Sequence, residues 1–157
     1  MTKRISIIGL LCFIVSACYI DDRVYEVNNS IAEHAWQIDS SLVYNFEIKD
    51  TTSAYDVFIN IRQRGDYEYQ NIILFTEFKS PNNQIRKDTL EYFLADDSGK
   101  WYGKGVGDIW LNHLPYRKNI LLPISGIYSF KITHAMRVNP LNHILDVGLR
   151  VQPHKNK

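Results

Sequence analysis

Apolar and polar residues alternate along most of the chain. Residues 42–49 place apolar side chains on one side of an extended backbone and polar side chains on the other, and the same alternation returns at 55–62, 128–134 and 145–152. Successive side chains of a β-strand point to opposite faces of a sheet, so this period of two predicts strands. A denser apolar run at 72–78 predicts a strand that is buried on both faces.

Turn-forming residues separate these segments. The clusters at 64–66 and 96–99 contain Gly and Asp and predict turns, with a further strand at 89–94 between them. Pro123 makes 121–123 an edge or connecting segment. No window shows a sustained helical repeat. We therefore predict an all-β fold, an antiparallel β-sandwich of Ig-like or jelly-roll-like type with about seven or eight strands, whose order the pattern leaves open.

The N-terminus departs from this pattern. Lys3 and Arg4 precede an almost unbroken apolar segment at 5–14, and small residues at 15–17 follow it. These are the parts of a secretory signal peptide. A membrane-spanning helix needs about 20 apolar residues, whereas this segment ends well short of that, before the acidic pair at 21–22. The segment is therefore predicted to be cleaved and not to span a membrane.

Cleavage after Ala17 would make Cys18 the first residue of the mature chain. The run from Val15 to Cys18 resembles the lipobox of bacterial lipoproteins, in which the cysteine thiol receives a diacylglycerol. We predict cleavage between Ala17 and Cys18 and lipid attachment at Cys18. The mature protein would then be held at a membrane by lipid.

Four segments follow from these assignments. They are a lipoprotein signal peptide at 1–17, a tether with a first strand at 18–35, a single β-sandwich domain at 36–152 and a C-terminal tail at 153–157. Removal of the signal peptide leaves 140 of the 157 residues, which is a usual size for one domain.

Charge and cysteine content exclude several functions. Without Lys3 and Arg4, 16 basic side chains stand against 17 acidic ones. No positive excess is left for nucleic acid, so no nucleic-acid partner is expected. Cys12 lies in the signal segment and Cys18 would carry lipid, so the mature domain has no thiol for a disulfide, a thiolate metal site or a cysteine nucleophile.

Other catalytic or metal-binding chemistry has little support in the sequence. No serine stands in a nucleophile-elbow motif. The segment 103–107 is rich in glycine, but no helix start follows it, which favours a flexible loop or bulge over a phosphate-binding loop. His134 continues the apolar face of its strand, which favours a hydrogen-bonded, partly buried histidine over a ligand. We predict no enzyme, no metal and no cofactor. None of the five histidines has the spacing of a metal pair: His34, His113, His134, His143 and His154.

Three aromatic residues form the remaining candidate site. Trp101, Tyr102 and Trp110 lie close together in the sequence and are a possible ligand platform for a sugar or a peptide. Large aromatic side chains in a sandwich more often pack in the core or along an edge. Both interpretations stay open at this stage.

Several short motifs follow one another between Cys18 and the last predicted strand. They are Trp36, 67–72 (YEYQNI), 88–90 (DTL), 99–105 (GKWYGKG), 126–130 (GIYSF), 136–137 (MR) and 146–150 (DVGLR). In this order and spacing they resemble the GldH-type gliding motility lipoproteins of the Bacteroidota.

This resemblance implies a cell-envelope lipoprotein needed for surface gliding and linked to protein secretion, acting as an assembly or interaction component. It implies no catalytic activity and carries over one functional residue, Cys18. The implied partners are other gliding or secretion proteins of the envelope, together with the membrane through the N-terminal lipid. Tyr19 is not the aspartate that follows the lipidated cysteine of some inner-membrane lipoproteins, which favours the outer membrane. The alternative is an envelope carbohydrate-binding module or glycan-active protein that uses the three aromatic residues.

Overall fold

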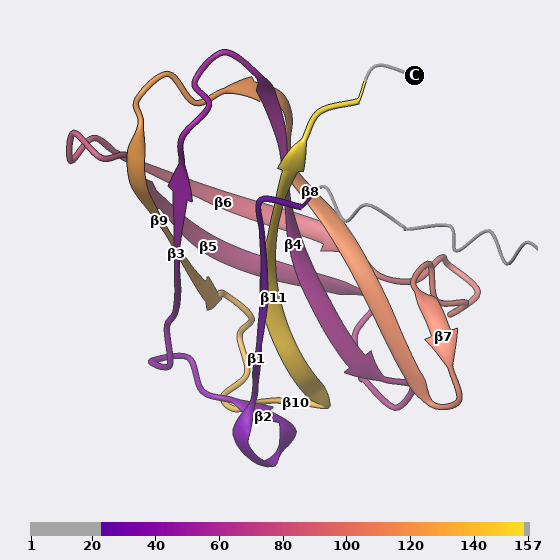
Figure 1. Cartoon of the computed structure of the whole chain (residues 1–157). Helices are drawn as coiled ribbons and strands as arrows, with labels where there is room; N and C mark the ends of the chain where they lie inside the picture. The colour runs from indigo at the N-terminus through magenta and orange to yellow at the C-terminus, as the bar shows by residue number, and fades with distance from the viewer. Residues whose placement is uncertain (1–22, 156–157) are drawn as a thin grey trace, which may run out of the picture.

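The computed structural model describes residues 23–155 and shows two layers of antiparallel β-strands packed face to face (Figure 1). The predicted all-β antiparallel sandwich is confirmed. Eleven strands lie in this part of the chain, and eight of them have six or more residues. The single helical turn among the described residues is the three-residue η1 (Ala32–His34).

A five-stranded sheet forms one layer. Its order is β1, β11, β4, β8 and β7, and all neighbours are antiparallel. Strands from the two ends of the described chain are therefore neighbours in this sheet. The strands span Tyr25–Ser30 (β1), Ile144–Pro153 (β11), Ala54–Arg64 (β4), Ile109–Leu121 (β8) and Lys104–Val106 (β7).

A four-stranded sheet forms the other layer, in the order β3, β9, β5 and β6. A short pair of strands, β2 with β10, lies at one end of the sandwich (Figure 1). The chain crosses between the layers several times, as in Greek-key and jelly-roll sandwiches. The strands span Leu42–Ile48 (β3), Gly126–His134 (β9), Asn71–Lys79 (β5), Ile85–Phe93 (β6), Ala35–Trp36 (β2) and Leu141–Asn142 (β10).

The inner faces of the two sheets meet in an aromatic and aliphatic core. Phe130 of β9 and Ile59 of β4 are fully buried. The ring of Phe130 meets that of Tyr116 on β8 edge-on, with 4.7 Å between centroids, a geometry that adds to the stability from burial alone. Tyr44 reaches across the layers, and its hydroxyl donates to the Val147 carbonyl at 2.6 Å. These contacts hold the sheets against each other.

The prediction that residues 72–78 are buried on both faces is wrong. In β5, Ile72 and Leu74 point into the core, whereas Phe75 on the other face is 54% exposed. The apolar run misled because nothing in the described residues covers the outer face of the four-stranded sheet at this point. Burial on both faces occurs instead on β4, where Asp56 and Asn60 of the outer face are buried among polar neighbours.

The prediction of a flexible loop or bulge at 103–107 is also wrong. Lys104–Val106 forms β7 and pairs with β8 in a hairpin. The ring of Trp110 lies over Gly105, and a Cβ added to this glycine would come within 2.8 Å of the ring. The glycine therefore gives the indole room to cover the hairpin, which a side chain at this position would block.

Candidate functional site

The predicted lipid-attachment residue, Cys18, and the predicted cleavage position after Ala17 lie outside the described residues. The described chain begins at Arg23, two residues before β1. Within residues 23–155, no helix is long and apolar enough to cross a membrane. The anchor therefore stays a prediction from the sequence.

Each of the three predicted platform residues has its own surroundings. Trp101 packs on Tyr67, with 6.3 Å between ring centroids, and Trp110 covers Gly105. Tyr102 is 63% exposed. Among the described residues, no ring contact joins the three side chains to one another. The first two support the fold locally, and the ligand platform stays a prediction.

The histidines include one buried residue and one pair that shares a hollow. His134 is fully buried beside Trp36, so the expectation of a partly buried histidine is wrong in the extent of burial; the Trp36 backbone lies near its ring. His34 and His143 line a hollow of about 380 Å³, where His143 Nδ1 lies 2.9 Å from Asp66 Oδ1. No group of three metal-ligating side chains able to hold an ion occurs within residues 23–155.

The outer face of the five-stranded sheet carries a polar network around Asn60. The Nδ2 atom of Asn60 donates to Glu26 Oε1 at 3.0 Å and to Asn28 Oδ1 at 3.1 Å. Its Oδ1 atom lies 2.7 Å from His113 Nδ1. Asn60 is almost fully buried, and both the nitrogen and the oxygen of its amide have partners, so the network joins β1, β4 and β8. A small hollow of about 130 Å³ opens beside it.

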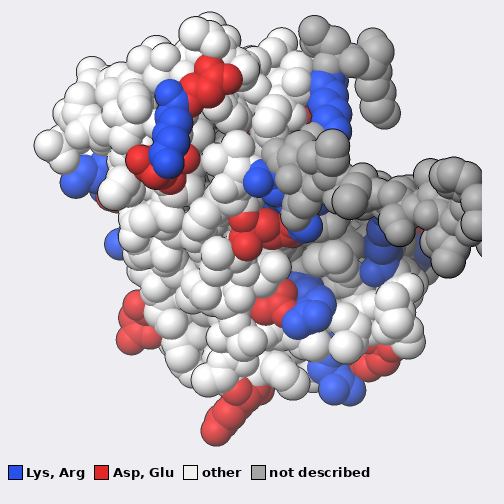
Figure 2. All heavy atoms as spheres, viewed as in Figure 1, with Lys and Arg blue, Asp and Glu red and all other residues white. Residues whose placement is uncertain are grey.

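An ion pair lies next to this network. Arg62 of β4 pairs with Asp146 of β11, and burial raises the pKa of the Asp146 carboxyl, while Arg62 opposes that rise. On the face toward the viewer in Figure 2, basic and acidic side chains lie next to one another. This face is therefore a mixed-charge surface.

The outer face of the four-stranded sheet is different, because large apolar side chains are exposed on it. Val43 of β3, Phe75 of β5 and Ile127 of β9 are each at least half exposed. Sheet register places Phe75 between Thr133 of β9 and Thr89 of β6. We call the outer-facing residues Val43, Phe75, Glu77, Lys87, Thr89, Ile127, Lys131 and Thr133 the Phe75 face.

Charged side chains border the centre of the Phe75 face. Lys131, Glu77 and Lys87 stand in one cross-strand row, and Lys87 Nζ lies 3.2 Å from Glu77 Oε2. A hollow of about 300 Å³ opens beside Phe75, and this row forms part of its wall. An apolar centre with a charged border is typical of a surface that binds another protein.

A polar contact with the other sheet holds the edge of this face in place. On β6, Asp88 accepts a hydrogen bond from the Tyr116 hydroxyl of β8 at 2.7 Å and pairs with Arg86. Burial acts to raise the pKa of Asp88, but the hydrogen bonds from Tyr116 and Arg86 prevail and lower it. The carboxylate thus fixes β6 to the five-stranded sheet.

Sequence reasoning missed the Phe75 face because it assigned Phe75 to the core. Of its members, it placed Lys131 and Thr133 on an outer face, since both alternate with buried residues of the same strand. The period of two within β5 was the one available signal, and the apolar residues on both sides of that strand hid it.

The described residues define a protein of the antiparallel β-sandwich class. The GldH lipoprotein family matches residues 23–151, and the chain belongs to this family. The gliding motility lipoprotein GldH homolog of Christiangramia forsetii is 40% identical over 141 residues, covering 85% of this chain and 86% of that protein. The gliding motility lipoprotein GldH of Flavobacterium johnsoniae is 29% identical over 157 residues, covering 96% of both.

Similarity to solved structures is low. A β-porphyranase of glycoside hydrolase family 86 from Bacteroides plebeius aligns with a TM-score of 0.40 and 16% identity, over 84% of this chain and 21% of that one. A structure of the T13 particle of infectious bursal disease virus aligns with a TM-score of 0.36 and 14% identity, over 96% of this chain and 36% of that one. The chain thus spans well under half of these proteins, and similarity at this level carries no argument about function.

Proposed function

We propose that this protein is a lipid-anchored component of the cell envelope that serves gliding motility by binding other proteins of the gliding and secretion apparatus. Family membership and two near full-length relatives named as gliding motility lipoproteins support this role. The Phe75 face supports binding, not catalysis, as the means. Tyr19 after the lipidated cysteine supports the outer membrane as its location.

The anchor is Cys18, which becomes the first residue after cleavage behind Ala17. Cys18→Ser is expected to abolish labelling with radioactive fatty acid and to leave the precursor uncut, because the lipid is transferred to the thiol. Cys12→Ser is the matched control and should keep both labelling and cleavage. Labelling that persists in Cys18→Ser would contradict the anchor. Two or more acyl chains hold far more firmly than one, at about 0.8 kcal/mol per buried CH₂.

The observation that carries the binding role is the exposure of Phe75 on β5, an inner strand of the four-stranded sheet. A buried Phe contributes strongly to a protein interface, whereas on a free surface it gains nothing from contact with water. Exposed apolar groups that gather on one face of a soluble domain mark sites of interaction. The charged row beside Phe75 adds specificity for the partner's orientation.

Phe75→Asp is expected to abolish gliding while leaving the domain folded. Its matched control is Val106→Asp on β7, where an equally apolar side chain is 82% exposed at a distant edge. The free energy of unfolding of each variant, measured by urea titration, should lie within about 0.5 kcal/mol of the parent's value, since neither side chain packs in the core. Normal spreading of Phe75→Asp cells on agar, or equal loss in both variants, would count against the Phe75 face.

A further inference from the structure

We infer that the end of the sandwich at which β1 begins rests on the lipid surface, and that the opposite end points away from the bilayer. This orientation rests on the lipid attachment at Cys18 proposed above. It adds the surface that contacts lipid, which the anchor alone does not specify. We call these the anchor end and the distal end.

The length of the tether counts against the inverted orientation. The Val24 amide donates to the Val151 carbonyl at 2.9 Å and so holds Val24 on β11. The tether therefore runs from Cys18 to Val24, six Cα–Cα steps that span at most about 22 Å. Tyr25 pairs with Val151, and Val151 with Val57 of β4, so about eight residues, or about 26 Å, separate the level of Val24 from Arg64 at the other end of β4. If the distal end lay on the bilayer, Val24 would stand above the reach of its own tether.

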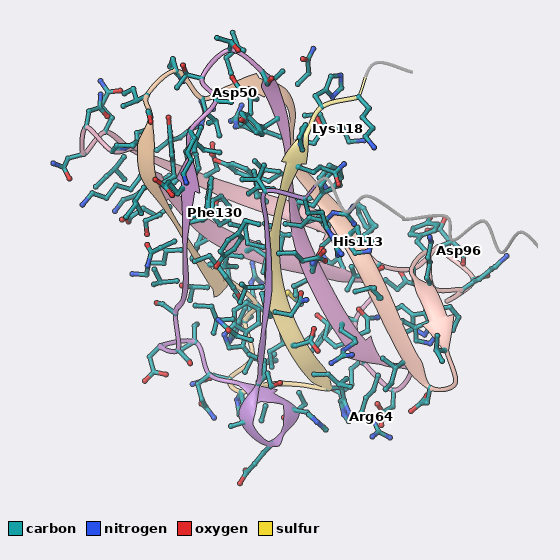
Figure 3. The ribbon with its side chains drawn as sticks, in the orientation of Figure 1. Asp50, Arg64, Asp96, His113, Lys118 and Phe130 are labelled. Atoms are coloured by element: carbon teal, nitrogen blue, oxygen red, sulfur yellow. The ribbon has the colours of Figure 1, made fainter. Side chains whose placement is uncertain are left out.

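Hydrogen bonds and register show which groups share the anchor end with the start of β1. The Val24 amide donates to the Val151 carbonyl at 2.9 Å, and the His154 amide donates to the Ala54 carbonyl at 2.8 Å. Ala54 is in turn paired with Leu121 of β8. The start of β1 and the C-terminal end of β11 lie together in Figure 1, and Asp50 and Lys118 lie at the same end in Figure 3.

The anchor end has the side chains that a lipid surface accepts. Leu121 is 63% exposed, and Val24 is also exposed. Lys49 and Lys118 are exposed cations at this end, where Glu47 and Asp50 are exposed carboxylates. Apolar side chains enter the headgroup boundary, and cations are attracted to lipid phosphates.

The distal end has a different charge balance. Arg64 is shared there by two carboxylates, with Nε 3.4 Å from Asp66 Oδ1 and an Nη atom 3.2 Å from Asp108 Oδ2. Arg64 and Asp66 line the hollow that His34 and His143 share, and Glu33 adds an exposed carboxylate to it. Around Arg64 three carboxylates, those of Glu33, Asp66 and Asp108, therefore stand against one guanidinium, and anionic phosphates would repel this cluster. Figure 3 shows Arg64 at the end of the molecule opposite Lys118.

A pair of single-cysteine variants tests the orientation. Leu121→Cys places a thiol at the anchor end, and Val106→Cys places one at the distal end, because Val106 pairs with Ile109 and Ile109 with Arg64. Both positions are exposed and apolar, and the processed, acylated chain has no other free thiol. Each variant is labelled with the same fluorophore and reconstituted, with its lipid, in vesicles of phosphatidylethanolamine and phosphatidylglycerol that carry a headgroup quencher.

We expect quenching at position 121 to be several-fold stronger than at position 106. Equal quenching would mean that the sandwich lies on its side, and stronger quenching at position 106 would mean that it is inverted; either result overturns the orientation while leaving the anchor intact. Protein that fails to float with the vesicles would instead overturn lipid attachment, and the orientation with it. The fluorescence of each probe in vesicles that lack the quencher lipid is the reference against which quenching is calculated.

Discussion

At the scale of single residues, His134 is the clearest departure from ordinary surroundings. Its ring is fully buried and lies edge-on to Trp36, with 5.3 Å between centroids. Burial lowers its pKa from the ordinary 6.5, because the charged imidazolium would lose its water; a weaker interaction with the Trp36 backbone opposes this. As the pH falls below about 6.5, His134 therefore becomes protonated in the unfolded chain before it does so in the folded chain.

This difference predicts a pH-dependent loss of stability. The contribution of neutral His134 is fully present above pH 6.5 and is lost as the pH falls below that value towards the folded pKa. His134→Leu should therefore flatten the decline in the free energy of unfolding between about pH 7 and pH 5, measured by urea titration at each pH. The slope is the readout, so a lower overall stability of the variant does not disturb the test.

The contribution of a second histidine, His113, to the pH dependence of stability must be distinguished from that of His134. Burial lowers the pKa of His113, and the positive charge of Arg150 adds to that effect. His113 thus contributes to the same pH range, and His113→Gln is the variant that measures its share. If His134→Leu kept the parent's full slope while His113→Gln removed it, the assignment to His134 would be refuted.

At the scale of one strand, β9 separates core from surface. Phe130 is fully buried between the sheets, whereas its neighbour Lys131 is exposed on the Phe75 face, as the alternation predicts. Phe130→Ala should destabilise the domain by about 3–5 kcal/mol, because a cavity would remain where the ring packs on Tyr116. This is a large part of a typical total of about 5–15 kcal/mol.

Lys131→Ala is the comparison on the same strand. It should change the free energy of unfolding by less than about 0.5 kcal/mol in a urea titration, because no packing is lost. Any loss of gliding that it caused would then report on the Phe75 face. If Lys131→Ala unfolded the domain and Phe130→Ala left it stable, the assignment of inward and outward side chains on this strand would be wrong.

Strands with clean alternation could be predicted from the sequence, and β8 could not. β8 is the longest strand in the described chain, yet Pro115 lacks a ladder donor and Asn112 takes an inward position. The register between β4 and β8 shifts next to Pro115, which pairs with Phe58. Asn112 lies away from the shift, and its Nδ2 atom donates to Gln63 Oε1 at 3.3 Å. A sequence pattern cannot show that β8 itself will bulge beside its proline, because the bulge appears only when β8 is paired with β4.

At the scale of the whole molecule, pairing between distant segments limits prediction. β1 pairs with β11 from the other end of the described chain. Alternation shows that each strand has two faces but does not identify its neighbours. Lipid attachment at Cys18 could be proposed from the sequence because the features of a signal peptide are contiguous in the chain, and it stays a prediction. The Phe75 face was not, because it exists only once β3, β9, β5 and β6 are placed in that order.

The last prediction concerns folding without the anchor. A chain of residues 24–157 contains no cysteine and keeps every described strand. It should fold as a soluble unit with a β-type circular dichroism spectrum and one cooperative melting transition that neither reductant nor EDTA shifts.

A chain of residues 31–157 is the informative comparison, because it lacks β1. Removal of β1 leaves the outer side of β11 unpaired and takes Tyr25 away from Phe46, where the ring centroids are 5.8 Å apart. The shorter chain should therefore melt at a lower temperature and aggregate more readily through its open edge. Equal melting temperatures of the two chains would mean that β1 is part of the tether and not of the folded domain. A helical spectrum of the longer chain, or a melting temperature that EDTA lowers, would contradict the prediction that residues 24–157 fold on their own.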